Sequence, residues 1–290
     1  MNSRKNILKA GVFLLMAGLF FLLSTQSQAA VKKLNILDGH KKKSCQVDLD
    51  GDGKKEKLSL SVKYENDYIL EAVLYVNGKK AAVVPDAQGE YDIKADYIKM
   101  SDSGIFIRCQ TSGDSYVSRS DYFYKYNPTK KKLVKGTKLL DVNESSSSAQ
   151  IKAVTNSEVK VKYKHQLDVV GHISWTATYV VKDGQLKLKP SVSKAKNTTT
   201  TKYGDPDGYG RLLEKNQYKC KYDINLYKNT NMKKIAYTTK PEDILTLKRI
   251  KYTKDDWYVQ FEKDGKIGWV NLKGFGSREI FYGINARMAG

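Results

Sequence analysis

The sequence WYVQFEKDGKIGWV, from Trp257 to Val270, decides the fold of the C-terminal region. Every second residue from Trp257 to Phe261 is apolar, and apolar residues resume beyond the pair Asp264-Gly265. Alternation with a period of two is typical of a β-strand, and Asp-Gly is a favoured pair in a two-residue turn of type I′. The stretch therefore predicts a β-hairpin.

Three shorter apolar stretches precede this hairpin, at Ile224 to Tyr227, Ile235 to Tyr237 and Ile244 to Ile250. Five short strands in ~60 residues predict a small closed barrel. The early Leu226-Tyr227, the WYV strand and the GKIGWV return resemble those of bacterial SH3-like (SH3b) domains. The resemblance implies an SH3-like β-barrel that binds cell-wall peptides or glycans.

The aromatic residues of this region supply the candidate ligand contacts. A barrel of ~60 residues has little else to bury, so we expect most of its aromatic rings, Trp257 among them, in the core. We select Tyr227, Tyr258 and Trp269 as candidates for an exposed groove, because amphipathic rings pack well on peptides or sugars. For each of the three, a place in the core is the alternative.

The region from residue 31 to residue 193 is predicted to be all-β, because no part of it sustains a helical period over three turns. Hairpin turns are expected at Asn77-Gly78, at Asn127-Pro128 and at Asp183-Gly184, ~50 residues apart. This spacing suits a small sheet that is repeated about three times. The units could be propeller blades or hairpins of one sandwich, and the sequence leaves both readings open.

Residues 194–210 are rich in Thr, Lys, Gly and Asp, with a Thr198 to Thr201 run and the segment Gly204 to Gly208. A segment of this composition cannot bury apolar surface. We therefore expect a linker between the repeat domain, residues 31–193, and the barrel with its C-terminal tail, residues 211–290.

The segment DLDGDGKKE, residues 48–56, places carboxylates at positions 1, 3, 5 and 9 of a glycine-containing loop. Such a loop can surround one hard cation with oxygen atoms. Position 12, where an EF-hand has Glu, is Ser59, and a strand pattern follows. The segment resembles the calcium loop of FG-GAP and VCBS-type repeats, which implies one calcium ion. The implied ligands are the side chains of Asp48, Asp50, Asp52 and Glu56 and the carbonyl of Lys54. A tight turn that favours Asp and Gly is the alternative.

The first thirty residues have the pattern of a secretory signal peptide. Arg4, Lys5 and Lys9 precede an apolar run from Ala10 to Leu23, and a small-x-small end follows at Ser27-Gln28-Ala29. The run is shorter than the ~20 residues of a membrane span, so we expect cleavage and no transmembrane segment afterwards. A retained anchor is the alternative.

The formal net charge is +20, and removal of residues 1–30 leaves about +17. For an exported chain the expected polyanions are anionic polymers of the cell envelope rather than nucleic acid. The alternative is that the lysines only keep the surface soluble and bind no partner. We expect a protein that is secreted and associated with the cell wall.

Catalytic residues are hard to assign. His40, His165 and His172 are the only histidines, and none stands at metal-ligand spacing from another. Cys109 with a histidine could form a cysteine-peptidase dyad, but Cys109 lies in a strand-like context, whereas such nucleophiles usually open a helix. We therefore predict a non-catalytic binding protein. A wall hydrolase whose active site is not recognised, or an adhesin or inhibitor of another protein, is the alternative.

The three cysteines are an odd number for an exported chain. Cys45 and Cys109 fall on expected strands and could pair, which would leave Cys220 as a thiol.

Overall fold

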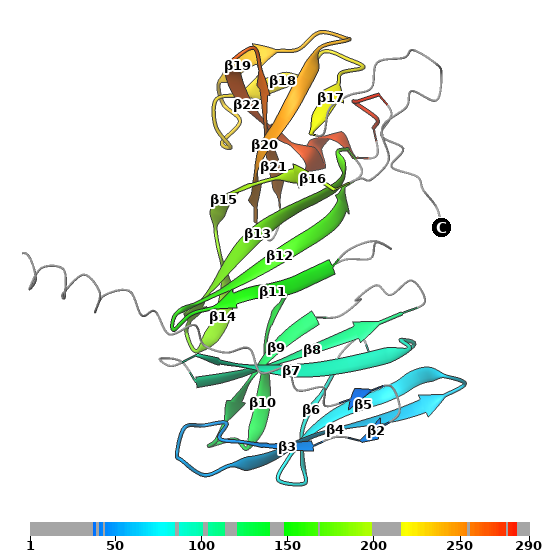
Figure 1. Cartoon of the computed structure of the whole chain (residues 1–290), viewed down its shortest axis with the longest axis vertical. Helices are drawn as coiled ribbons and strands as arrows, with labels where there is room; N and C mark the ends of the chain where they lie inside the picture. Colours follow the sequence, from blue (N-terminus) through cyan, green and yellow to red (C-terminus); the bar gives the residue numbers. More distant parts are fainter. Residues whose placement is uncertain are drawn as a thin grey trace, which may run out of the picture.

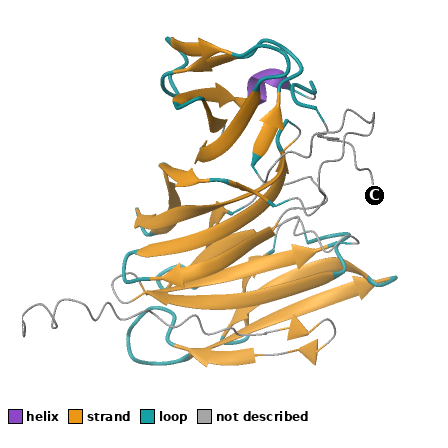
Figure 2. Ribbon diagram, turned by 45° about the horizontal axis from the view of Figure 1, so that its top comes forward, coloured by secondary structure: helices purple, strands orange, loops and turns teal. Residues whose placement is uncertain are grey.

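The computed structural model describes residues 37–38, 41–42, 44–84, 87–100, 104–113, 121–139, 148–167, 169–198, 216–253, 256–276 and 278–282. These residues form strands β1 to β22 and one short 3-10 helix, η1 (Leu272–Phe275), so the chain is all-β (Figure 2). The expected signal peptide, residues 1–30, lies outside this description. None of the described helices has the length and apolar character to cross a membrane.

Three antiparallel sheets follow one another in chain order along the long axis of the molecule, and each is built on a meander of four strands (Figure 1). The first sheet contains β3 (Ser44–Val47), β4 (Glu56–Glu65), β5 (Tyr68–Val76) and β6 (Lys79–Val83). The second contains β7 (Asp92–Met100), β8 (Gly104–Ser112), β9 (Asp121–Asn127) and β10 (Lys132–Lys138). The third contains β11 (Ser148–Val154), β12 (Glu158–Leu167), β13 (Gly171–Lys182) and β14 (Gln185–Lys189). A separate pair, β1 (Leu37–Asp38) and β2 (Lys41–Lys42), precedes them.

The three predicted hairpins are present, and each joins the third and fourth strands of its sheet. The turns Asn77-Gly78 and Asp183-Gly184 have positive φ at both residues, as a type I′ turn requires. The predicted threefold repeat is therefore a real feature of the fold, in which each unit is one antiparallel meander.

Two hydrophobic cores hold these sheets together. The first lies between the first and second sheets and includes Leu58, Leu74 and Ile107. The second includes Phe123 of the second sheet, Tyr163 of the third and Phe261 of the C-terminal region. The second sheet thus has one face in each core, and the C-terminal region shares its core with the sheets before it.

The C-terminal region forms a fourth sheet, in which the predicted hairpin is present as β21 (Trp257–Lys263) and β22 (Lys266–Asn271). The order is β15-β20-β21-β22-β18-β19, with β17 also paired with β20. The other strands are β15 (Ser191–Lys194), β17 (Gln217–Lys219), β18 (Asn225–Tyr227), β19 (Ile235–Thr238) and β20 (Ile244–Tyr252).

The expectation of a closed barrel is wrong for the part of the chain that the structure describes. One edge of β20 pairs with β21, and the other is occupied by β17 and β15. β19 stands at the opposite end of the strand order and pairs with β18 alone among the named strands. The sheet therefore stays open.

The strands also extend into the segment that we expected to be a linker. Lys194 ends β15, which pairs with β20, and β16 (Lys196–Asn197) returns to pair with β13 of the third sheet. Between them, the Ala195 amide donates to the carbonyl of Lys248 over 3.1 Å. Residues 194–198 are therefore part of the fold, and residues 199–210 lie outside the described residues.

Candidate functional sites

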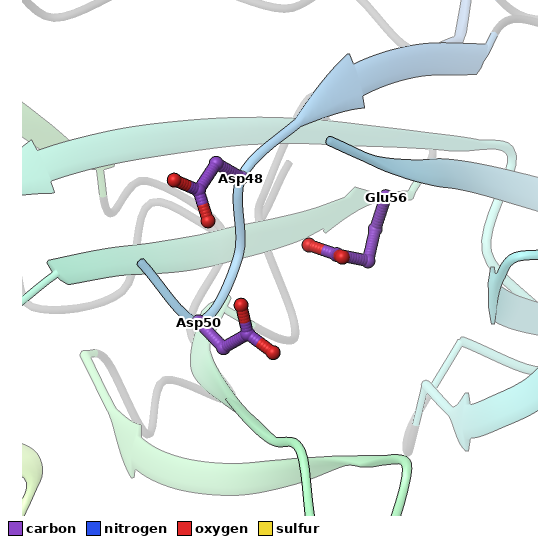
Figure 3. A group of neighbouring side chains, drawn as sticks. All are labelled: Asp48, Asp50 and Glu56. Atoms are coloured by element: carbon purple, nitrogen blue, oxygen red, sulfur yellow. The ribbon is translucent and has the colours of Figure 1, made fainter. Parts of the chain in front are cut away.

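The acidic loop follows β3, and its last residue, Glu56, opens β4. Asp48, Asp50 and Glu56 each place a carboxylate oxygen within 4.8 Å of the others (Figure 3). Three of the four predicted carboxylates therefore gather at one point. The fourth, Asp52, is exposed and accepts a hydrogen bond from the Lys54 amide over 2.7 Å.

Backbone hydrogen bonds hold this loop in a compact form. The Asp48 carboxylate accepts from the amides of Gly51 and Gly53 over 2.7 and 3.1 Å. Both glycines have φ between 85° and 88°, a region that other residues rarely adopt. The Glu56 carboxylate is buried and accepts from the Leu49 amide over 2.8 Å.

The loop also contacts neighbouring strands. Asn77, in the β5–β6 turn, accepts from the Lys57 amide through its side chain and donates its own amide to the Lys57 carbonyl, both over 2.8 Å. Tyr126 of the second sheet lies near the acidic group: desolvation first, and then the charges of Glu56 and Asp50, raise the pKa of its hydroxyl. The sequence did not indicate Tyr126, because its approach depends on how the two sheets pack.

The aromatic candidates of the fourth sheet lie on one face of it. Tyr227 is opposite Trp269, and Trp269 is opposite Gln260. Tyr258, two residues before Gln260, shares that face because side chains alternate along a strand. Val259 and Phe261 point the other way, into the core. We call the face that carries Tyr227, Tyr258, Gln260 and Trp269 the outer face of the fourth sheet.

The three aromatic residues differ in exposure. Tyr227 and Tyr258 are half-buried, whereas Trp269 is only 8% exposed. Trp269 is nevertheless absent from both hydrophobic cores, as its place on the outer face requires. It therefore forms the base of this face, and the two tyrosines offer the accessible rings.

Two basic residues that the sequence did not assign to a binding site also belong to this face. Arg249 is opposite Gln260, and Lys251 is opposite Tyr258. The Lys251 ammonium lies 5.8 Å from the centre of the Tyr258 ring and donates to the Thr230 hydroxyl over 2.8 Å. Thr230 is in the loop after β18, so this loop reaches the outer face. The alternation of residues along β20 is visible in the sequence and would have placed Arg249 and Lys251 on one face. Only the pairing of β20 with β21 shows that Tyr258 lies next to them.

The cysteines are all free thiols in the structure, so Cys45 and Cys109 do not pair. Cys109 is completely buried in the core between the first two sheets, and burial raises the pKa of its thiol well above the ordinary value. A dyad with His165 is not formed, because His165 stacks on Trp257 on the other side of the second sheet. Burial likewise raises the pKa of Cys220 to about 11.

A buried ion pair joins the second sheet to the third. The Arg108 Nε atom donates to Asp121 over 2.7 Å, and its Nη2 atom donates to the carbonyl of Ala149, in β11, over 2.8 Å. Gln110 also donates to Asp121, over 3.1 Å. Complete burial raises the pKa of the Asp121 carboxyl, and the hydrogen bonds from Arg108 and Gln110 partly offset this effect. In the sequence, the sign of this buried pair was Arg108, a charged residue within the apolar run FIRC, residues 106–109.

In the comparisons with known proteins, no protein family, no curated protein and no solved structure matches this chain.

Proposed function

We propose that this chain is an exported, non-catalytic protein of the cell surface that binds a cell-wall peptide or glycan. The observation that carries the proposal is the outer face of the fourth sheet, where Tyr227, Tyr258 and Trp269 come from three adjacent strands.

The chemistry of this face suits such a ligand. The half-buried rings of Tyr227 and Tyr258 can pack on the apolar face of a sugar or on a peptide side chain. Arg249 and Lys251, beside them, can pair with a carboxylate of the ligand.

We also propose that the acidic loop holds one calcium ion. Carboxylate oxygens are the ligands that calcium prefers, and Asp48, Asp50 and Glu56 already lie close enough together to share an ion. Asp52 and the carbonyl of Lys54 belong to the same loop and could complete the set. The ion would neutralise the mutual repulsion of the carboxylates and so stabilise the connection between β3 and β4.

Sedimentation with purified cell walls tests the binding proposal. At 1 M salt the Debye length is ~3 Å, so diffuse attraction between exposed charges is screened while apolar contact persists. The whole chain should still bind walls under these conditions, and Tyr258→Ala should weaken the binding about tenfold, the effect of losing ~1.4 kcal/mol.

The matched control is Tyr222→Ala. Tyr222 is 45% exposed, packs under Arg278 and lies outside β18, β21 and β22. This variant should bind as the unmodified chain does. Loss of all binding at 1 M salt, together with a silent Tyr258→Ala, would show that the outer face is not a binding site.

A further inference from the structure

A row of lysines runs along the third sheet on the face that points away from the core. Lys160, Lys162 and Lys164 alternate along β12 with residues of the second core, such as Val161 and Tyr163. Lys160 and Lys164 are exposed and Lys162 is half-buried. Alternation along a strand therefore places all three ammonium groups on one side of the sheet.

The neighbours of this lysine row are short. Across β12, the register pairs the three lysines with Thr178, Thr176 and Ser174 of β13 and with Ala153, Gln150 and Ser148 of β11. None of these side chains is as long as lysine. The lysines can consequently extend beyond their neighbours to reach a ligand that lies along the strand.

The row carries a positive charge that the described residues leave unbalanced. None of the three lysines has a described hydrogen bond or ion pair. Lys196, opposite Ser174 on the far side of β13 from Lys164, adds another cation to this face. Glu158 is the only carboxylate on the strands of the third sheet, and it is paired with Lys189 over 2.9 Å. The face thus carries a net positive charge, which favours a polyanion as its partner.

The spacing of the row indicates which polyanion fits. Alternate residues of a strand lie about 6.6–6.8 Å apart. A phosphodiester repeat with six backbone bonds, as in a polyol phosphate, spans about the length of two extended residues, ~7 Å. We propose that Lys160, Lys162 and Lys164 bind successive phosphates of a linear phosphodiester polymer of the cell envelope.

The same face argues against a nucleic acid as the preferred partner. The outward positions of β12 and β13 carry no Phe, Tyr or Trp. Proteins that bind single-stranded nucleic acids combine a basic groove with aromatic rings on which bases stack. Among the outward positions of β12 and β13, His172 near the start of β13 is the one aromatic ring, so the face can contact phosphates through its lysines and hydroxyls but offers no row of rings for bases.

This inference rests on the proposed location of the protein at the cell surface, but it concerns the third sheet, whereas the wall ligand is assigned to the fourth. The probe is immobilised poly(glycerol phosphate), and the measurement is the binding constant of the whole chain at several salt concentrations. The triple variant K160Q/K162Q/K164Q should bind at least about tenfold more weakly at ~0.15 M salt and should reduce the slope of log K against log salt by about 2. K160R/K162R/K164R, which keeps the charges, should bind within about threefold of the unmodified chain.

The matched control removes the same charge elsewhere. Lys63 on β4, Lys99 on β7 and Lys130 in the β9–β10 turn are exposed and have no described ion pair. At the same ~0.15 M salt, K63Q/K99Q/K130Q should lower the affinity by less than about threefold, because the Debye length is then ~8 Å and charges outside the lysine row are screened. Equal losses in the two glutamine variants would overturn the proposal in favour of diffuse attraction.

Two further results would also overturn it: tighter binding of single-stranded DNA than of poly(glycerol phosphate), or equal binding of a carboxylate polymer such as polygalacturonate. Wall binding that persists at 1 M salt in K160Q/K162Q/K164Q would leave the proposed function standing whatever the result for the lysine row.

Discussion

The ring of His165, in the third sheet, stacks on the ring of Trp257, in the fourth, with their centres 5.1 Å apart. Trp257 also meets Trp175 edge-on at 5.4 Å and contacts Tyr252 at 4.5 Å. These rings come from strands on both sides of the junction between the two sheets. The C-terminal region is therefore joined to the repeat region by a packed aromatic cluster.

The first prediction concerns Trp257. The sequence predicted this ring inside the core, but Trp257 is half-buried and packs against the second core. We expect Trp257→Ala to lower the free energy of unfolding by about 3 kcal/mol, because loss of this large ring leaves a space between the sheets. Tyr258→Ala should lower it by less than about 1 kcal/mol, because Tyr258 lies on the outer face. Urea denaturation followed by tryptophan fluorescence and circular dichroism measures both values. Equal losses would mean that Trp257 contributes no more than a surface residue.

The second prediction is a dependence of stability on pH. Burial, and secondarily the charge of His172, lowers the pKa of His165 from 6.5 to about 4. Between pH 4 and pH 6.5 the unfolded chain binds more protons at His165 than the folded chain, so lowering the pH in this range favours unfolding. The stabilisation that comes from keeping His165 neutral is therefore complete above pH 6.5 and is lost as the pH falls towards 4. The loss is on the order of 3 kcal/mol for this group alone.

Thermal melting between pH 7 and pH 4 tests this expectation. His165→Phe preserves a ring against Trp257 and should flatten the dependence in this window, whereas His172→Gln should largely retain it. A slope that is unchanged in His165→Phe would assign the effect to other groups, with the carboxylates as the first candidates.

The sequence predicted the local parts of the fold well because short-range chemistry determines them. Asp264-Gly265 has positive φ at both residues, and it joins β21 to β22 as expected. The same reasoning placed the hairpins at Asn77-Gly78 and Asp183-Gly184. Each of these turns depends on two adjacent residues, which a sequence displays directly.

Non-local pairing was the part that could not be predicted. Val192 pairs with Lys251, far along the chain, and this contact keeps the fourth sheet open and orders the start of the expected linker. The polar composition of residues 191–198 concealed the burial of Ala195 and Asn197. In the candidate sites, residue type indicated Tyr258 and Asp48, but Lys251 and Tyr126 became visible only through strand register and sheet packing.

The third prediction concerns calcium. Addition of calcium to the metal-stripped protein should raise the melting temperature, because a ligand that binds only the folded state stabilises it by about 2.7 kcal/mol at one hundred times its dissociation constant. Asp50→Ala should abolish the rise. Glu65→Gln, which changes an exposed carboxylate at the other end of β4, should retain it. An unaltered melting temperature in millimolar calcium would show that the loop is an ordinary turn and not a calcium site.

The last prediction concerns the buried pair of Arg108 and Asp121, which are 4% and 0% exposed. Arg108→Met leaves the Asp121 carboxylate buried without its cation, and we expect a loss of about 3–5 kcal/mol in the free energy of unfolding. Arg108→Met combined with Asp121→Leu removes both charges, so the double variant should recover most of that loss. A double-mutant cycle in urea, with Asp121→Leu as the other single variant, measures the coupling. A double variant that is no more stable than Arg108→Met would show that packing around Arg108, including its bond to the Ala149 carbonyl, matters more than the charge pair.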